Sequence, residues 1–349
     1  MPKVNQQLIA DKLKLSRATV SRCFTNHPWI DPETRARVFD LASRLGYTHR
    51  ETRHAANQPA RRTRLVFGVL ICIEHSDFNT FSPGSGVLAG LSEMARAKDV
   101  RLDLHFVRPR DLHLDSPSYR KIFEQRKRRH DGLILIYPFP ATIVNELRER
   151  YPVVSLVEQY GARPLDSVDV DNHGGIAKVV DRLYALGHRR IGFLTWRYAV
   201  EAGWPLRRYS GFMERAAALG LDVQPEDLIN VSARDHLDYA ELHAHAVART
   251  RGGVTAWICA ADHQAQHLVQ ALQAQGLRVP EDVSVTGFDA LPAENGEPIL
   301  TSVQVPFRQI GIMGGERLLD LIARRYTVAQ HILLDCELRE GATTGPPRR

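Results

Sequence analysis

From Leu65 onward the chain alternates short apolar runs with longer segments of helical periodicity, and this alternation limits the possible folds more than any other feature. The runs are short enough for strands, and they are apolar at successive positions rather than at every second one. Such strands are buried on both faces, as in a parallel sheet that helices cover on each side. The sequence therefore predicts an α/β body. Strands are expected at 64–72, 100–107, 131–138, 152–158, 167–171, 190–195, 227–232, 255–261 and 283–289, and helices near 85–98, 118–129, 142–150, 174–186, 205–219, 238–249 and 262–275.

The alternation falls into two series. A segment at about 160–166, which has neither a strand nor a helix pattern, separates them. We therefore expect two similar Rossmann-like lobes of parallel sheet. Ligands bind such sheets at the carboxyl ends of the strands, and two lobes that face each other form a cleft there. A small molecule is expected to bind in that cleft.

Composition excludes several classes of protein. The chain has 349 residues, 44% of them hydrophobic and 25% charged, which is typical of a soluble globular protein with more than one folding unit. No apolar run approaches the roughly 20 residues of a membrane helix. The first residues, MPKVNQQLIADK, lack the apolar core of a signal peptide. The four cysteines form no CxxC pair, which suits the reducing cytosol. We expect a cytoplasmic protein without membrane contact.

Charge is distributed unevenly along the chain. Residues 1–64 contain 13 Lys and Arg against 5 Asp and Glu, a local charge of +8, whereas the whole chain carries only +6. The remaining residues are thus slightly acidic. A basic head on a nearly neutral body is typical of a nucleic-acid-binding module attached to another domain. An exposed basic face without a partner would have the same charge, so the residue pattern must decide.

Three short helices are expected in the basic head. Asn5 can cap the first helix, and Ser16 can cap the second, which ends near Phe24. The third helix, within IDPETRARVFDLASRLGY, has Asp31 as its cap and a proline at its first position. Two short helices braced by a third form a helix-turn-helix unit. We therefore predict an all-α helix-turn-helix domain at 1–48.

The second helix has two different sides. Val20 and Phe24 fall on one side and suit a buried interior. Arginine on the other side can read guanine through paired hydrogen bonds to O6 and N7, and hydroxyl groups near a helix start can bind phosphates. These features predict a recognition helix in the major groove of DNA. The DNA-binding candidates of the head are Asn5, Ser16, Arg17, Ala18, Thr19, Ser21 and Arg22.

The segment LSRATVSRCF, followed by IDPETRARVFDLASRLGY, resembles the head of the LacI family of bacterial transcriptional regulators. In that family the first, second and sixth residues after the cap read bases, so the resemblance implies this role for Arg17, Ala18 and Arg22. Lys14 stands where the family usually has glycine. If a left-handed backbone is needed at this position, lysine costs about 1 kcal/mol.

A basic linker is expected at 49–64, where the family has a hinge helix that wedges a leucine into the minor groove. His49 stands at the usual proline and Ala56 at the usual leucine. Since alanine is a poor wedge, we expect the linker to contact phosphates through Arg50, Arg53 and the arginines that follow.

The body resembles the periplasmic-binding-protein-like effector domain of the same family. The resemblance runs through VDVDNHGGIAKVVDRLYALGHRRIGFLT, LRRYSGF, GLRVPEDVSVTGFDA and PILTSVQVPFRQIGIMGGERLL. It implies that the chain recrosses between lobes after about Ala290 and that a final strand near 331–338 belongs to the second lobe. The expected effector-binding and dimerisation domain covers 65–342, with lobe one at about 65–163 plus 290–326 and lobe two at about 164–289 plus 327–342.

The resemblance also implies effector-binding residues. In relatives an arginine three residues before Gly-Phe and the aspartate of VTGFDA bind sugar hydroxyls, which here are Arg208 and Asp289. Family members commonly have Asn-Asp where this chain has Ala261 and Asp262, so one amide anchor is missing and the ligand is expected to differ from a common hexose. Aromatic residues on or near strand-end loops can stack on an effector, although ordinary packing explains each of them equally well. The effector-binding candidates are Phe81, Tyr137, Trp196, Arg208, Asp262 and Asp289, with Trp204 nearby.

The sequence gives little support for an enzymatic function. The glycines of PGSGVLAG start too far after the first strand for a dinucleotide-binding turn and suggest helix packing. His263 and His267 have a spacing that can bind metal, but no third ligand is evident, so no metal site and no cofactor are expected. We also find no GxSxG nucleophile elbow and no P-loop, so we expect no enzyme.

We expect a homodimeric, sequence-specific transcriptional repressor that binds double-stranded operator DNA. Its affinity for the operator should be controlled by a small molecule, a sugar or a derivative. The C-terminal GATTGPPRR carries no leucine-heptad extension, which favours a dimer over a tetramer. The alternative is a cytoplasmic solute-binding protein or sensor without a specific DNA function.

Overall fold

The computed structural model describes residues 5–24, 30, 32–45, 64–72, 83–107, 116–123, 130–161, 164–232, 237–292, 299–325 and 328–348. These residues form two compact units. The first comprises Met1–Asp169, Ala199–Glu201 and Phe307–Ile332, and the second comprises Val170–Tyr198, Ala202–Pro306 and Leu333–Arg349.

The head consists of the three predicted helices, α1 (Gln6–Leu13), α2 (Arg17–Phe24) and α3 (Pro32–Arg44). Each helix contacts the other two. Ile9 and Ala10 of α1, Val20 and Cys23 of α2, and Val38, Phe39 and Ala42 of α3 are buried. The rings of Phe24 and Phe39 have centroids 5.3 Å apart and join α2 to α3. These residues form one small core, which contains Val20 as predicted, and the partly buried Phe24 lies at its side.

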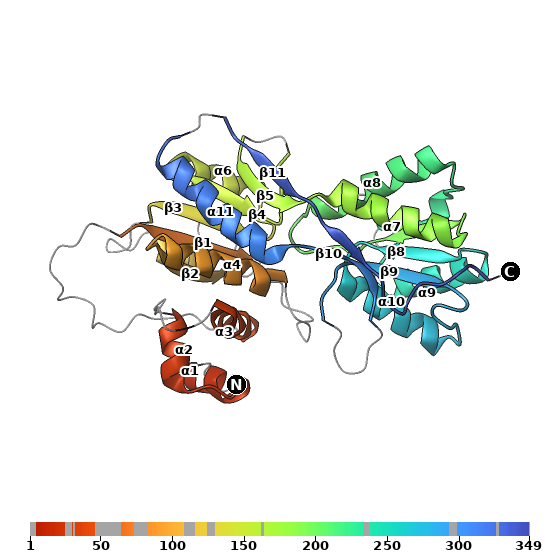
Figure 1. Cartoon of the computed structure of the whole chain (residues 1–349), viewed down its shortest axis with the longest axis horizontal. Coiled ribbons are helices and arrows are strands. Elements are labelled where there is room, and N and C mark those ends of the chain that lie inside the picture. The colour runs from red at the N-terminus through yellow and green to blue at the C-terminus, as the bar shows by residue number, and fades with distance from the viewer. Residues whose placement is uncertain are drawn as a thin grey trace. The chain divides into compact units, whose positions relative to one another are not determined.

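The first unit contains a sheet of six strands in the described residues, in the order β11-β5-β4-β3-β1-β2 (Figure 1). Strands β1 through β5 pair with their neighbours in parallel. The strands are β1 (Val66–Cys72), β2 (Arg101–Val107), β3 (Gly132–Ile136), β4 (Val153–Leu156), β5 (Asp166–Val170) and β11 (His331–Leu334). Its helices are α4 (Pro83–Ala97), α5 (Pro117–Phe123), α6 (Ala141–Arg150) and α11 (Phe307–Ile322).

Successive residues of β3 identify which helices cover each face of this sheet. A Cβ atom at Gly132 would meet the side chain of Leu318 on α11. The next residue, Leu133, belongs to a buried cluster with Ile122 of α5 and Ile143 of α6. Helix α11 therefore lies on one face and α5 and α6 on the other. This arrangement explains why the central strands are apolar at successive positions.

Helices α4 and α11 pack unusually closely. A Cβ atom at Gly90 of α4 would lie 1.8 Å from the carbonyl oxygen of Arg308, and one at Gly311 would lie 2.0 Å from the carbonyl oxygen of Val87. Only glycine allows such an approach. Gly86 and Gly90 of PGSGVLAG thus serve the packing of these helices, as predicted, whereas Gly84 lies against Tyr137.

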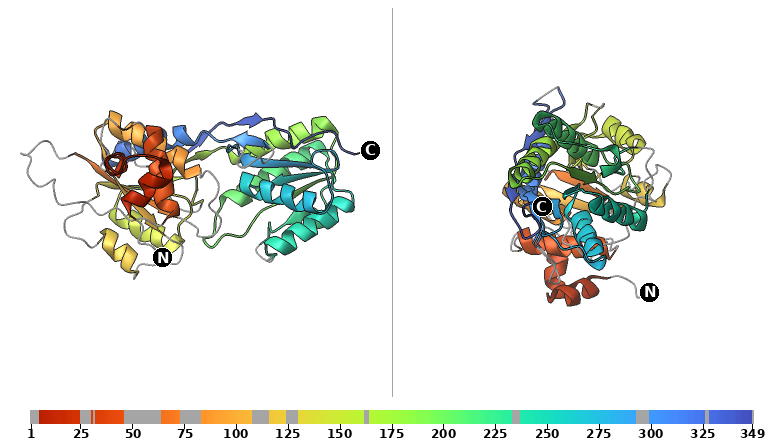
Figure 2. Two further views of the ribbon diagram at one scale, coloured as in Figure 1. Left: turned by 90° about the horizontal axis from the view of Figure 1, so that it is seen from below. Right: turned by 90° about the vertical axis from the view of Figure 1, so that its right-hand side faces the viewer.

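The second unit contains another sheet of six strands, in the order β12-β10-β9-β8-β6-β7. Neighbouring strands of this sheet are parallel except β10 and β12, which are antiparallel. Helices α7 and α8 lie on one face and α9 and α10 on the other (Figures 1 and 2). The strands are β6 (Ile191–Leu194), β7 (Leu228–Ile229), β8 (Ala256–Cys259), β9 (Ser284–Asp289), β10 (Thr301–Gln304) and β12 (Glu337–Arg339). The helices are α7 (Asn172–Leu186), α8 (Trp204–Leu219), η2 (Pro225–Asp227), α9 (Tyr239–Arg251) and α10 (Asp262–Ala274).

The chain crosses between the units later than expected. Strand β5 was expected in lobe two, which was to begin at about 164, but it pairs with β4 in the first sheet, with Val154 opposite Asp166. Strand β10 was expected in lobe one, which was to resume at about 290, but it pairs with β9 in the second sheet. The helix-free segment near 160–166 is therefore a connection within one sheet. The sheet to which a strand belongs is decided by the neighbouring strand with which it forms hydrogen bonds. The hydrophobic periodicity of the sequence does not identify that neighbour.

The final strand near 331–338 also differs from expectation, because it is two short strands in different sheets. Strand β11 borders β5, with the amide of Asp171 donating to the carbonyl of Leu334 at 2.8 Å. Strand β12 pairs with β10. The expected range spans both strands, and the division between units falls between Ile332 and Leu333.

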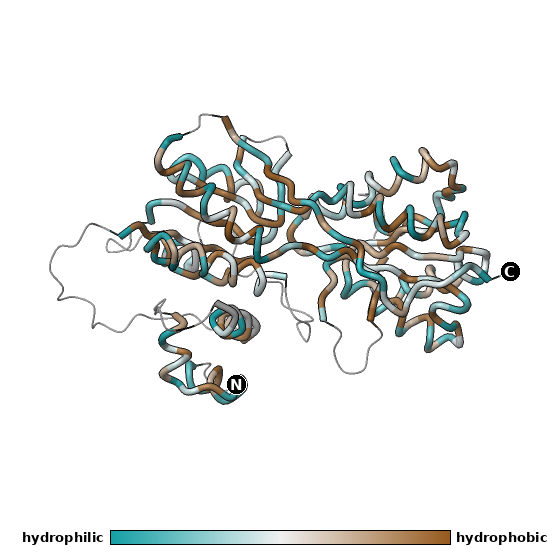
Figure 3. The backbone as a smooth tube through the Cα atoms, viewed as in Figure 1, coloured by the Kyte–Doolittle hydropathy of each residue, from teal (hydrophilic) through white to brown (hydrophobic). Residues whose placement is uncertain are grey.

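Hydropathy follows this architecture (Figure 3). The central strands β1, β3 and β8 are continuously hydrophobic or nearly so, whereas the helices alternate hydrophobic and hydrophilic residues along their length. Among the described residues, no helix combines the length and the apolar character that a membrane crossing requires.

Candidate functional site

Helix α2 has one buried and one exposed side. Val20 and Cys23 are fully buried against the other head helices, whereas Arg17, Ala18 and Arg22 are exposed. Thus the two predicted arginines and the small residue between them face outward. This is the arrangement that a helix needs if long donors are to reach base edges while its other side packs on a core.

The start of α2 is closed by a side-chain cap. Oγ of Ser16 accepts a hydrogen bond from the amide of Thr19 at 3.0 Å, and it lies 2.9 Å from Oγ1 of Thr19. Ser16 is exposed and Thr19 is half-buried, as is Ser21 one turn from the start. Ser16 therefore fixes the helix start and also presents a hydroxyl group beside the helix amides, where phosphates bind.

Lys14 adopts the left-handed backbone conformation at the end of α1. Its φ is 53° and its ψ is 40°, and its amide bonds the carbonyl groups of Ala10 and Asp11. Glycine normally occupies such a helix end because a Cβ atom is strained there. Lys14 thus has the left-handed backbone for which a cost of about 1 kcal/mol is expected.

Asn5 caps α1 as predicted. Its Oδ1 accepts a hydrogen bond from the amide of Leu8 at 2.9 Å, and the side chain is exposed. This bond stabilises the head and leaves a DNA contact for Asn5 as a prediction. Arg50 and Arg53, together with most of the linker, lie outside the described residues.

A second candidate site surrounds Arg208 on α8, within the second unit. Arg208 is 6% exposed, and its Nε donates to Oδ1 of Asn172 at 2.8 Å. Its Nη1 donates to the carbonyl oxygen of Ala260. The guanidinium carbon lies 3.6 Å from the ring centre of Phe288 and 4.5 Å from that of Trp204. The guanidinium is thus held in one orientation by hydrogen bonds and aromatic contacts.

Asp289 ends β9 beside this guanidinium. Its Oδ1 lies 3.6 Å from Nη2 of Arg208. Its φ is 130°, in the region that strongly favours glycine, and Ala290 follows with a φ of 49°. Two consecutive strained residues indicate that the backbone is held there to place the carboxylate.

The carboxylate of Asp262 forms hydrogen bonds next to this strained segment. Its Oδ2 accepts from the amide of Leu291 at 2.7 Å, and its Oδ1 accepts from Oγ of Ser302 at 2.5 Å. A Cβ atom at Gly287 would lie 2.2 Å from Oδ1 of Asp262, so β9 approaches as closely as glycine permits. These bonds show that Asp262 organises the end of β9.

Burial raises the pKa of Asp262 to about 6, although the hydrogen bonds from Ser302 and Leu291 oppose this rise. The next residue, His263, is half-buried, and desolvation together with the nearby charges of His267 and Arg208 lowers its pKa to about 4. The start of α10 therefore carries two neighbouring groups whose burial disfavours the charged form of each.

The aromatic candidates are placed differently. Trp196 is 5% exposed and belongs to the core cluster of the second unit, where its ring contacts Tyr239, His263 and His267. This favours packing over stacking on an effector. Tyr137 ends β3 in the first unit, and its hydroxyl accepts from the amide of Gly84 at 2.6 Å. Phe81 lies outside the described residues.

Sequence reasoning missed three members of the Arg208 site. These are Asn172 and Phe288, which contact the guanidinium, and Ser302, which bonds Asp262. Asn172 follows Asp171, which caps α7, so a capped helix start directly after a strand was an available signal. Phe288 directly precedes Asp289, but its orientation toward Arg208 follows from the β9 pleat and could not be read from spacing.

Comparisons with known proteins identify relatives over nearly the whole chain. A family model described as a periplasmic binding protein-like domain matches residues 180–344. The HTH-type transcriptional repressor CytR of Escherichia coli K12 is 29% identical over 344 residues, covering 95% of this chain and 93% of the relative. The repressor MelR of Bacillus subtilis 168 is 27% identical over 344 residues, covering 95% and 94%.

Solved structures share the fold. A complex of the transcriptional regulator CelR with cellobiose has a TM-score of 0.65 at 23% identity, covering 98% of this chain and all of that one. The Lac repressor dimer bound to operator and an anti-inducer has a TM-score of 0.64 at 21% identity, covering 98% and 99%.

Proposed function

Because the chain belongs to the LacI family of bacterial transcriptional regulators, we propose that it represses transcription by binding operator DNA through α2 of its head. A small molecule at the Arg208 site controls that binding. The relatives are regulators of transcription, and this chain is not an enzyme.

The exposed side of α2 carries the DNA-binding proposal. Arg17 and Arg22 are exposed on a helix whose other side is fully buried, so the core does not need their charges. An arginine in this position can bond O6 and N7 of guanine, which distinguishes base pairs by about 1–3 kcal/mol. Ala18 between them can contact a thymine methyl group. The charge of +8 in residues 1–64 supplies attraction to phosphates of any sequence.

The Arg208 site supports a carbohydrate-like effector. Oriented guanidinium and carboxylate groups hold neighbouring hydroxyl groups, because one donates and the other accepts. Trp204 is only partly buried beside Arg208, and its ring suits the apolar face of a sugar, whereas the fully buried Phe288 supports the guanidinium from below. The CelR–cellobiose complex is a fold relative that binds a sugar. Ala261 stands at the start of α10 where relatives commonly have asparagine, so the site lacks one side-chain amide. We therefore propose that the effector is a sugar derivative whose hydrogen-bonding groups differ from those of a common hexose.

The regulator acts as a homodimer in the cytoplasm in this proposal. A two-fold protein reads two half-sites of a near-palindromic operator, and the Lac repressor relative was solved as a dimer on its operator. Effector binding that favours one arrangement of the body changes operator affinity by a coupling of about 1–3 kcal/mol, or roughly 5- to 150-fold.

Retention on immobilised genomic DNA tests the proposal. The intact chain should be retained at moderate salt, whereas a chain that begins at Leu65 and keeps the whole body should pass through. Salt should elute the intact chain steeply, since phosphate contacts release counterions. Equal retention of both chains would contradict the proposal and favour a solute-binding protein or sensor without a specific DNA function.

A thermal-shift screen of the chain that begins at Leu65 tests the effector. Sugars, sugar acids and purines are the compounds to compare. A compound that raises the melting temperature should also change operator retention of the intact chain. A compound that raises it without any effect on retention would contradict the coupling.

A further inference from the structure

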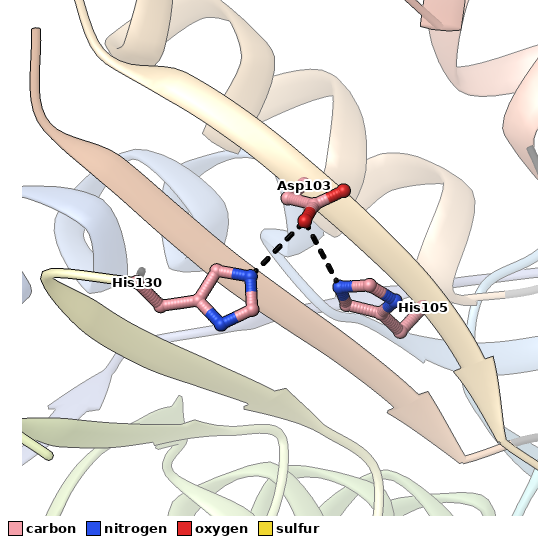
Figure 4. Close-up of side chains that lie close together, drawn as sticks. All are labelled: Asp103, His105 and His130. Carbon is pink, nitrogen blue, oxygen red and sulfur yellow. Dashed lines mark hydrogen bonds and ion pairs between the residues drawn. The ribbon is translucent and has the colours of Figure 1, made fainter. Parts of the chain in front are cut away.

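Three side chains that the regulator function does not use converge on one face of the first sheet. They are Asp103 and His105 on β2, and His130, which lies just before the start of β3 (Figure 4). Nε2 of His130 lies 3.1 Å from Oδ2 of Asp103, and Nε2 of His105 lies 3.3 Å from the same oxygen. One ligand atom from each residue lies within 4.8 Å of the other two.

Glycine in the intervening strand makes this convergence possible. Strand β1 lies between β2 and β3, and Gly68 of β1 stands opposite Asp103 in the register. A Cβ atom at Gly68 would lie 3.0 Å from Cγ and 3.1 Å from Cδ2 of the His130 ring. The missing side chain therefore provides the space in which His130 reaches across β1 toward Asp103. The site is built into the sheet and does not depend on a surface loop.

The surroundings partly exclude water. The side chain of His130 is 1% exposed, that of His105 is 11% exposed and that of Asp103 is 17% exposed. The ring of Phe123 packs edge-on against His130 at 6.3 Å, and the rings of His105 and His130 are 5.6 Å apart. Nε2 of His105 is buried, and within the described part of the chain it forms no well-aligned hydrogen bond, although it lies 3.3 Å from Oδ2 of Asp103.

The distances match those between ligands of one metal ion. Zinc binds histidine nitrogen at about 2.0–2.1 Å and carboxylate oxygen at about 2.0–2.2 Å, so two ligand atoms at a tetrahedral angle lie about 3.3 Å apart. Both Nε2–Oδ2 distances are close to this value. An ion would also give the buried Nε2 of His105 the partner that a misaligned carboxylate does not provide.

We propose that Asp103, His105 and His130 bind one zinc ion in the first unit of this regulator. Two imidazoles and one carboxylate form a ligand set that suits zinc, and water completes the tetrahedron. The ion joins the edge strand β2 to the start of β3 across β1. Zinc thereby stabilises the first sheet of the effector domain.

Titration of untagged, full-length protein with zinc chloride after chelator treatment tests the proposal. Calorimetry should give one ion per chain, and zinc should raise the melting temperature. Cobalt chloride should give the intense visible absorption of a tetrahedral cobalt site. Asp103→Asn keeps the shape of the side chain but removes the anionic ligand, and it should lower zinc affinity at least tenfold. His105→Gln should do the same and should abolish the cobalt spectrum.

Two control variants separate this site from other histidines. His267→Gln alters the histidine pair on α10 that could bind metal by spacing, and His173→Gln removes an exposed histidine on α7. Both should bind zinc like the wild type. Unchanged binding in Asp103→Asn and His105→Gln with normal circular dichroism would overturn the proposal. Loss of binding in His267→Gln, or a wild-type protein that takes up no zinc, would overturn it as well.

Discussion

Oδ1 of Asp289 lies 3.6 Å from Nη2 of Arg208, and both side chains are only 8% exposed. The carboxylate belongs to a backbone that is held in a strained conformation, while Asn172 and the Ala260 carbonyl hold the guanidinium. A buried ion pair with separate supports on each side keeps its geometry without a ligand. We therefore propose that it acts as a preorganised pair of a donor and an acceptor for the hydroxyl groups of an effector.

Asp289→Asn should weaken effector binding and leave operator binding unchanged. The amide keeps the shape but removes a charged acceptor, which costs about 1.5–3 kcal/mol, or roughly 10- to 150-fold in affinity. Titration of operator release with the compound found by thermal shift measures the effect. Asp222→Asn, an exposed aspartate of the same unit, is the matched control. Superimposable dose–response curves for wild type and Asp289→Asn would remove Asp289 from the site.

Lys14→Gly should stabilise the head. Lysine is strained at a φ of 53°, whereas glycine is not, although glycine gains more freedom in the unfolded chain. The net gain should be about 0.5–1 kcal/mol, so the amides of α1 and α2 should exchange hydrogen roughly two- to fivefold more slowly. Lys12→Gly, inside α1, removes the same charge but should speed exchange. Faster exchange in Lys14→Gly would show that the left-handed conformation is not strained.

His263 should make the second unit less stable in mild acid. Desolvation lowers its pKa to about 4 in the folded protein, whereas an exposed histidine has a pKa of about 6.5. The unfolded chain therefore binds a proton first as pH falls, and stability is lost between about pH 6.5 and 4 by up to about 3 kcal/mol. Urea unfolding at pH 7.5 and pH 5 measures this loss.

Asp262 has the opposite effect on the pH dependence of stability over much of the range between pH 6.5 and 4. Its pKa is raised to about 6, so the folded protein binds its proton first and gains stability as pH falls from about 6 to 4. The two effects partly offset each other in the wild type. His263→Gln removes the loss that this histidine causes, so acidification to pH 5 should destabilise the variant less than the wild type. An identical pH dependence in both proteins would contradict the assignment to His263.

The sequence predicted the elements of the fold well because their signals are local. Cap residues, periodicity and apolar runs identified all three head helices, and the side chains of Asn5 and Ser16 cap α1 and α2 as expected. The crossings between units were not predicted correctly, because the sheet that β5 or β10 joins depends on a neighbouring strand. An apolar strand pattern is the same in either sheet.

For the sites, too, short motifs identified single residues but not the contacts between distant parts of the chain. Arg208 and Asp289 came from local motifs, but Asn172 contacts Arg208 from a different helix. Asp103 and His130 are 27 positions apart, and the space that joins them comes from Gly68 on a third strand. Contacts of this kind depend on strand order and register, which no short motif encodes.

Duplex binding by Arg22→Ala tests the central claim most directly. Its affinity for the operator selected by the intact protein is compared with its affinity for a scrambled duplex of the same length. Arg37→Ala, which removes an exposed arginine of α3, is the control. The account predicts that Arg22→Ala reduces the ratio of the two affinities by roughly 5- to 150-fold, equivalent to about 1–3 kcal/mol, while Arg37→Ala leaves the ratio nearly unchanged. Equal losses of Arg22→Ala on both duplexes would contradict the claim that α2 reads bases.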